Sequence, residues 1–214
     1  MIKERLGHRI DGWIHAVFPF LFWHRINPDW LTILGMLIAG SAGLAFAQGS
    51  FRLAGCLLVV GGFFDLVDGV IARHFEISTR FGAFLDSSLD RVVDILVMVG
   101  LLIHFTHTPI LKAGAFAVGT KPNELGMALC TVILVASVLT SYAKARAEGV
   151  VPRMPGGLLE RGERIGLLAL GSIFGFLWPV LWILAIGTVV TVGQRFLYAH
   201  REMARLDEEE RSVG

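Results

Sequence analysis

Several apolar stretches, each close to 20 residues long, most constrain what this chain can fold into. A helix of about 20 residues spans the hydrocarbon core of a bilayer and satisfies its own backbone polar groups. Only 17% of the 214 residues are charged, compared with about 25% in an average soluble protein. The sequence therefore predicts an all-α polytopic membrane protein. Its net charge of +1 does not indicate a nucleic-acid partner.

Turn-forming and polar residues divide the apolar stretches into six predicted membrane spans. Their approximate limits are residues 30–47, 51–74, 80–105, 124–147, 163–176 and 178–199. Residues 107–122 and 149–162 contain several Gly and Pro and are expected to form loops. Pro179 marks an expected turn between the last two spans.

The two ends of the chain differ from the spans in charge and periodicity. Residues 1–24 place polar and apolar side chains at helical spacing, which predicts an amphipathic helix on the membrane surface. We expect one membrane-embedded domain over residues 1–214. Residues 1–26 would form its juxtamembrane helix and residues 200–214 a charged cytoplasmic tail, either helical or frayed.

The distribution of Lys and Arg predicts the orientation in the membrane. Six spans place both termini on the same side, and most basic residues lie on that side. The opposite side holds only Arg52, Lys112 and Lys121. The positive-inside rule then predicts a multi-pass protein of the cell membrane with both termini in the cytoplasm.

Four aspartates lie inside predicted spans, near the cytoplasmic ends of the second and third. Asp65 and Asp68 are three residues apart, and Asp86 and Asp90 are four apart, so each pair shares a helical face. An aspartate at mid-membrane costs about 2.5–3.5 kcal/mol on insertion scales, and neighbouring carboxylates repel each other. Two divalent cations would balance four carboxylates. Hard cations such as Mg²⁺ or Mn²⁺ prefer oxygen ligands.

Two other interpretations of the aspartates stay open. Ion pairs with Arg73, Arg80 and Arg91 would account for two or three of them, but poorly for their shared helical faces. Intramembrane acids also mark ion pathways, so a divalent-cation transporter is an alternative function. A transporter would need acids along a path across the bilayer, whereas these cluster at one end.

Residues 65–90 resemble the signature of the CDP-alcohol phosphatidyltransferases, D-x2-D-G-x2-A-R-x8-G-x3-D-x3-D. All eight fixed positions are present, namely Asp65, Asp68, Gly69, Ala72, Arg73, Gly82, Asp86 and Asp90. The resemblance implies an enzyme of phospholipid biosynthesis. Such an enzyme transfers a phosphatidyl-type group from a CDP-diacylglycerol-type lipid to the hydroxyl of an alcohol and releases CMP. It also implies a homodimer in the lipid bilayer.

The resemblance further implies roles for individual residues. The implied metal ligands for two divalent cations, Mg²⁺ or Mn²⁺, are Asp65, Asp68, Asp86 and Asp90, and Asp90 is also the implied general base. The residues expected to bind the CDP-lipid are Gly69, Ala72, Arg73, Thr79 and Gly82, together with Asp29, Trp30, Leu31 and Thr32. The last four belong to an N-P-D-W-L-T stretch that often reads P-N in the family, so Asp29 is a departure.

A second resemblance concerns the acceptor alcohol. Residues 141–148 and 156–164 resemble phosphatidylinositol phosphate synthases, in which a basic pocket holds the phosphate of inositol phosphate. The resemblance implies that Lys144, Arg164 and Arg195 form this pocket, with side chains from three helices suited to a dianionic phosphate. These residues could instead mark the cytoplasmic ends of the last three spans. Glycerol 3-phosphate is the alternative acceptor, since it also carries a phosphate.

Overall fold

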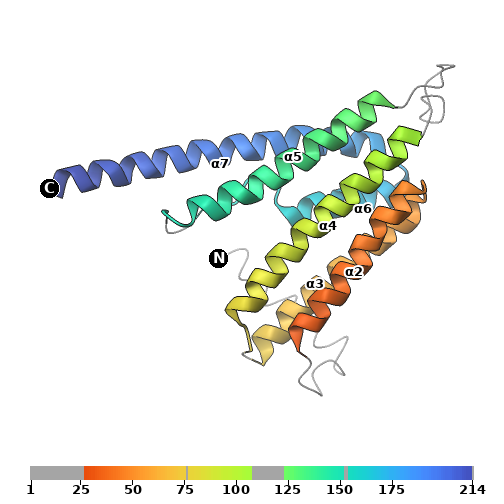
Figure 1. The fold of residues 1–214 in the computed structure, drawn as a ribbon, viewed down its shortest axis with the longest axis horizontal. Helices are drawn as coiled ribbons and strands as arrows, with labels where there is room; N and C mark the ends of the chain where they lie inside the picture. Colours follow the sequence, from red (N-terminus) through yellow and green to blue (C-terminus); the bar gives the residue numbers. More distant parts are fainter. Residues whose placement is uncertain (1–26, 76, 108–122, 152–153, 214) are drawn as a thin grey trace.

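A computed structural model describes residues 27–75, 77–107, 123–151 and 154–213 of the chain (Figure 1). This part contains six α-helices and no strand. The helices are α2 (Pro28–Ala47), α3 (Phe51–His74), α4 (Arg80–His107), α5 (Glu124–Ala147), α6 (Arg161–Phe174) and α7 (Leu177–Val213). The predicted surface helix over residues 1–26 and most of the loop over 107–122 lie outside the described residues. The all-α prediction is confirmed.

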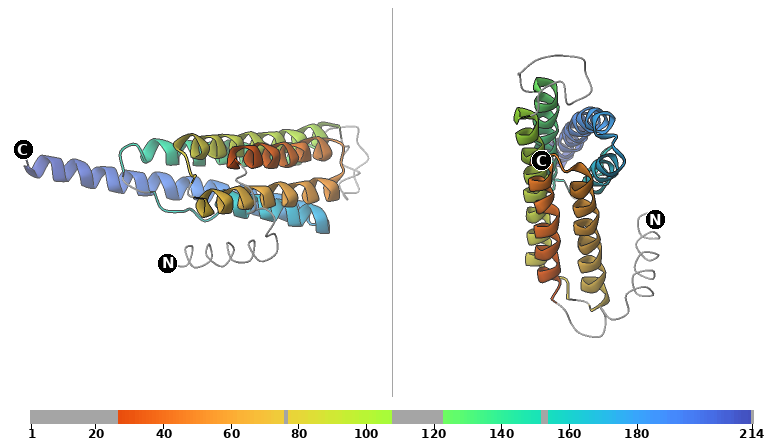
Figure 2. Two further views of the ribbon diagram at one scale, coloured as in Figure 1. Left: turned by 90° about the horizontal axis from the view of Figure 1, so that it is seen from below. Right: turned by 90° about the vertical axis from the view of Figure 1, so that its right-hand side faces the viewer.

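The helices are arranged in two layers (Figure 2). Helices α2, α4 and α5 lie side by side in one layer, and α3, α6 and α7 lie in the other. The two layers contact each other where α3 packs on α2 and where α7 packs on α5. The main apolar core lies between the layers and includes Phe46, Leu58, Leu101 and Leu181, all almost fully buried.

Glycines allow the closest helix contacts in the half of the bundle formed by α2, α3 and α4. A Cβ atom on Gly61 of α3 would lie 2.9 Å from the carbonyl oxygen of Gly35 in α2. A Cβ on Gly43 of α2 would lie 2.5 Å from the carbonyl oxygen of Leu96 in α4. Both distances are too short for any side chain. The small residues therefore bring these three backbones together, as they do in membrane helix pairs.

The turn between α6 and α7 lies earlier than Pro179, where the sequence predicted it. Helix α6 ends at Gly175, whose φ of 81° is a left-handed conformation that favours glycine. Pro179 lies in the first turn of α7, where its missing N–H has no helical partner to lose. The charged tail from residue 200, expected to be helical or frayed, is helical as far as the structure describes it. Helix α7 continues to Val213 and extends beyond the other helices (Figure 1).

Four of the six described helices are long and apolar enough to cross a membrane, namely α2, α3, α5 and α7. Many large apolar side chains on these helices are exposed, including Leu37, Val135 and Ile186, as expected of surfaces that face lipid. Helix α4 is long but carries several charged residues, and α6 has only 14 residues. The protein is therefore an all-helical membrane protein with at least these candidate spans.

Candidate active site

Three of the four predicted aspartates form one carboxylate cluster. Asp65 and Asp68 project from α3 and Asp86 from α4, and one oxygen of each lies within 4.8 Å of the others. Asp68 is buried, and the other two are half-buried. With side-chain shifts of under about 1 Å, three carboxylate oxygens at these separations can surround one Mg²⁺ ion, whose bonds to oxygen are about 2.0–2.1 Å long. The residues present therefore fit a Mg²⁺ or Mn²⁺ site.

The start of α2 is tied to this cluster by one side chain. Helix α2 begins after Asn27, whose side-chain oxygen accepts a hydrogen bond from Asp29 N at 3.0 Å. One turn later, Thr32 Oγ1 donates a hydrogen bond of 2.5 Å to Asp68 Oδ2. This contact fixes the orientation of a metal-site carboxylate. It joins the two sequence motifs through residues that are 36 positions apart.

A cavity of about 510 Å³ opens beside the cluster, between α2, α3 and the start of α4. Seven of the nine residues predicted to bind the CDP-lipid line it, namely Asp29, Thr32, Gly69, Ala72, Arg73, Thr79 and Gly82. Asp68 and Asp86 form its inner wall. We call it the polar cavity. The other two predicted residues lie elsewhere, because Trp30 is 70% exposed and Leu31 packs on a small apolar cluster around Ile71.

Glycine at position 82 keeps part of the polar cavity open. Thr79 Oγ1 accepts a hydrogen bond of 2.8 Å from Gly82 N at the start of α4. A Cβ on Gly82 would lie 3.1 Å from both Thr79 Oγ1 and Asp29 Oδ1. A larger side chain at this position would therefore crowd the polar groups that line the cavity.

A second cavity, also about 510 Å³, lies on the other side of the cluster, between α2, α3, α4 and α6. Most of its wall is apolar and includes Met36, Leu58 and Ile165. Its polar lining comes from Thr32, Asp65, Asp90 and Arg161. We call it the apolar cavity. Thr32 lines both cavities, and the aspartates are divided between them, so the carboxylates lie where the two cavities meet.

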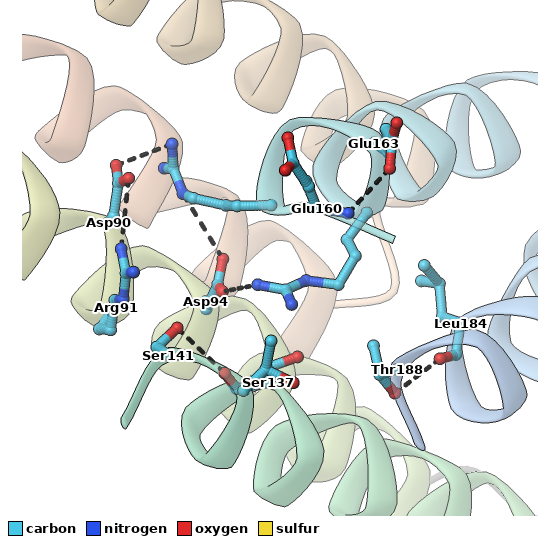
Figure 3. A network of polar contacts seen from close by, with 12 residues as sticks. Asp90, Arg91, Asp94, Ser137, Ser141, Glu160, Glu163, Leu184 and Thr188 are labelled. Carbon is cyan, nitrogen blue, oxygen red and sulfur yellow. Dashed lines mark hydrogen bonds and ion pairs between the residues drawn. The ribbon is translucent and has the colours of Figure 1, made fainter. Parts of the chain in front are cut away.

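Asp90, the predicted general base, is held by arginines and lies outside the three-carboxylate cluster. Arg161 Nη1 lies 2.7 Å from Asp90 Oδ1 and 3.6 Å from Asp65 Oδ2. Arg91 Nη1 lies 3.5 Å from Asp90 Oδ2 (Figure 3). The ion-pair interpretation is thus correct for Asp90 and Arg91. A metal contact of Asp90 would compete electrostatically with these two arginines.

One further aspartate, Asp94, lies a helical turn beyond Asp90 on α4 (Figure 3). It is buried and forms an ion pair with buried Arg164, with 3.0 Å between Asp94 Oδ2 and Arg164 Nη2. The sequence analysis did not single out Asp94 or Arg161. The spacing of Asp86, Asp90 and Asp94, each four residues after the last, could have indicated Asp94, because all three share one helical face.

The three residues predicted to bind the acceptor phosphate come from three helices but do not line one cavity in the described structure. Arg195 of α7 donates a hydrogen bond of 2.7 Å to the carbonyl oxygen of Thr140, and its buried Nε has no hydrogen-bond partner. It lines a cavity of about 510 Å³ beside residues 155–158. Arg164 borders a void of only about 20 Å³. Lys144 of α5 is half-exposed and lies 3.8 Å from Glu148.

Known proteins resemble this chain over most of its length. The sequence profile of the CDP-alcohol phosphatidyltransferase family matches residues 25–194. A phosphatidylinositol phosphate synthase of Mycobacteroides abscessus is 35% identical over 189 residues, which cover 85% of this chain and 80% of that protein.

Solved structures agree with the sequence match. A phosphatidylinositol phosphate synthase of Mycobacterium tuberculosis with CDP-DAG bound has a TM-score of 0.67 and 30% identity. That match covers 91% of this chain and 94% of the other. A structure of the same enzyme in complex with manganese and citrate has a TM-score of 0.68 and 32% identity, over 90% of this chain and 88% of the other. The resemblance read from residues 65–90 is confirmed, and the chain belongs to the CDP-alcohol phosphatidyltransferase family.

Proposed function

We propose that this enzyme transfers the phosphatidyl group of CDP-diacylglycerol to a hydroxyl of inositol phosphate and releases CMP. The observation that carries the proposal is the position of the aspartates between a polar and an apolar cavity. A CDP-lipid has the same division, with a nucleotide at one end, acyl chains at the other and a diphosphate between them. The cytidine would occupy the polar cavity and the acyl chains the apolar one, which places the diphosphate beside the carboxylates.

Asp65, Asp68 and Asp86 would hold the cations in this mechanism, and Asp90 would contact the second cation. When bound, the cations neutralise charge on the diphosphate and make CMP a better leaving group. The carboxylate cluster supports this assignment, because three buried or half-buried negative charges this close together require a counter-charge. Thr32 would keep Asp68 oriented through its hydrogen bond.

Asp90 would act as the general base. It would accept the proton of the acceptor hydroxyl while that oxygen forms a bond to the phosphorus attached to diacylglycerol. The bond between this phosphorus and the oxygen of the CMP phosphate breaks, and CMP leaves with the electron pair. Asp90 lies on the wall of the apolar cavity, next to Asp65, which is a position from which it could reach an acceptor at the cluster.

Inositol phosphate is the acceptor that the observations favour. The M. abscessus relative is named for its synthesis of phosphatidylinositol phosphate. The chain also places Lys144, Arg164 and Arg195 on neighbouring helices at this end of the bundle. Guanidinium groups pair well with phosphate oxygens, and the unbonded Nε of Arg195 offers one buried donor.

We further propose that all six described helices cross the membrane, with both termini and the aspartates at the cytoplasmic side of the cell membrane. Helix α4 packs beside α2 over much of its length (Figure 1), which supports counting it as a span. Helix α6 is short, about 21 Å at 1.5 Å per residue, and would span the bilayer with local thinning around it. Pairing of two copies is the oligomeric state expected from the family.

The test is CMP release by the purified protein with CDP-diacylglycerol and Mg²⁺, with inositol phosphate and glycerol 3-phosphate supplied in parallel. CMP formed only with inositol phosphate, and lost in Asp90→Asn, is the expected result. A Lys144→Gln variant, which leaves the arginine–aspartate pairs intact, should need a higher concentration of inositol phosphate while its KM for CDP-diacylglycerol stays unchanged. CMP formed only with glycerol 3-phosphate would replace the acceptor. No CMP with any alcohol, from folded and metal-loaded protein, would refute the proposed reaction.

A further inference from the structure

Arg161 of α6 lies among three carboxylates, one from α3 and two from α4. On one side its Nη1 contacts Asp90 Oδ1 at 2.7 Å and Asp65 Oδ2 at 3.6 Å. On the other side its Nε faces Asp94 Oδ1 at 3.9 Å. One guanidinium group is therefore shared between residues proposed for metal binding and catalysis and an aspartate that the mechanism does not use.

One carboxylate oxygen of Asp94 is held by a hydrogen bond, and the other has no hydrogen-bond partner. Arg164 Nη2 binds Asp94 Oδ2 at 3.0 Å, and both side chains are buried. Asp94 Oδ1 and Arg161 Nε are two of the four buried side-chain atoms without a hydrogen-bond partner in the described part of the chain. These two unbonded atoms face each other. A shift of about 1 Å would bring them to ordinary hydrogen-bond distance.

The position of Arg161 affects the metal site through charge. The Arg161 guanidinium group beside Asp65 and Asp90 neutralises the carboxylate oxygens that a divalent metal ion would use. Arg161 and the metal ion therefore compete for these oxygens. A move of Arg161 toward Asp94 would relieve this competition and leave Asp90 Oδ1 without its closest partner. Arg164 keeps Asp94 in place to receive it.

We propose that Asp94 is a positioning residue that draws Arg161 away from Asp65 and Asp90, so that these two carboxylates can take up metal and acceptor. The proposal rests on the proposed function only for the identity of Asp65 and Asp90 as working residues of the site. Asp94 itself contacts neither substrate nor metal.

Binding of Mn²⁺ alone to the full-length protein, measured by electron paramagnetic resonance, tests the proposal without any turnover. Asp94→Asn preserves the shape of the side chain but removes its charge. We expect it to weaken Mn²⁺ binding about tenfold, within the range found for residues of one ion-pair network. Asp94→Glu should bind Mn²⁺ nearly as tightly as the wild type. An Arg52→Gln control, exposed at the far end of α3, should leave Mn²⁺ binding unchanged.

Removal of Arg161 separates a positioning role from a structural one. The double variant Asp94→Asn with Arg161→Gln should bind Mn²⁺ as tightly as Arg161→Gln alone, because Asp94 acts on the metal site only through the charge of Arg161. A structural defect at Asp94 would persist in the double variant. Arg161→Gln alone should bind Mn²⁺ more tightly than the wild type, and this result can be obtained even if Asp94→Asn does not fold.

Unchanged Mn²⁺ binding in Asp94→Asn, or weaker binding in Arg161→Gln, would overturn the proposal. The outcome is independent of the acceptor, since no acceptor is present. If the wild type binds Mn²⁺ with these dependences but forms no CMP with any alcohol, the proposed reaction fails while the role of Asp94 stands.

Discussion

Substitution of Asp86 by Asn should make the metal-free protein more stable than the wild type and the metal-bound protein less stable than the wild type. The Asp86 carboxylate lies within 4.8 Å of oxygens of Asp65 and Asp68. At an effective dielectric constant of about 20, two unit charges at that distance repel by roughly 3.5 kcal/mol. Asn has the same shape without the charge, so the metal-free variant loses both repulsions.

The net effect is smaller than the two pairwise energies suggest. Asp65 and Asp86 are half-exposed and screened by water, and Arg161 already offsets part of their charge. We therefore expect a gain of about 1–2 kcal/mol in metal-free protein, which corresponds to roughly 2–8 °C in Tm for a chain of this length. With saturating Mn²⁺ the order reverses, because a ligand at about 100 times its Kd stabilises the wild type by about 2.7 kcal/mol and the variant loses most of this.

The assay is thermal unfolding of detergent-solubilised protein at about pH 8, where free carboxylic acids are ionised, in EDTA and then in Mn²⁺. Asp207→Asn is the matched control, since Asp207 is exposed on the end of α7, and its Tm should not change in either buffer. Two results would contradict the reasoning. One is a metal-free Asp86→Asn protein that melts no higher than the wild type, and the other is a variant that Mn²⁺ stabilises as strongly as the wild type.

Three further substitutions test other parts of the site and fold. Asp90→Asn should lower the rate of CMP release by about 10²–10⁴, the usual contribution of a general base, while CDP-diacylglycerol binding in an equilibrium assay is retained. Gly82→Val should raise the KM for CDP-diacylglycerol, because even a Cβ would lie 3.1 Å from Thr79 Oγ1. An unchanged KM would place the nucleotide elsewhere. Gly43→Ala should destabilise the protein by about 1–3 kcal/mol, as overpacking does, because its Cβ would meet the Leu96 carbonyl oxygen. A Tm equal to that of the wild type would show that α2 and α4 are not this close.

The sequence predicted those features that depend on spacing along one helix. Apolar runs located the helices, and the intervals between Asp65, Asp68, Asp86 and Asp90 placed each pair on one face. The carboxylate cluster followed from these intervals once α3 and α4 both packed on α2. Seven of the nine residues expected to bind the CDP-lipid likewise line one cavity.

Features that depend on packing between distant helices could not be predicted in this way. Arg161 reaches Asp90 only because α6 begins two residues before its predicted start. The Glu163 side chain accepts a hydrogen bond of 2.8 Å from Glu160 N, which starts the helix there. The sequence also left open whether residues 200–213 continue as a helix or fray, because they lack an apolar run. Exposed pairs such as Arg205 with Glu209, 3.0 Å apart, support a helix without one.

The unbroken α7 makes the end of the chain a rigid rod. Its 37 residues correspond to about 55 Å at 1.5 Å per residue, whereas the hydrocarbon core is about 30 Å thick. Some 25 Å of helix therefore extends past the bilayer in line with the segment that carries Arg195. A helical domain fused in register after residue 213 would keep a fixed angle to the bundle. The fused domain could serve as an orientation marker for imaging the membrane protein.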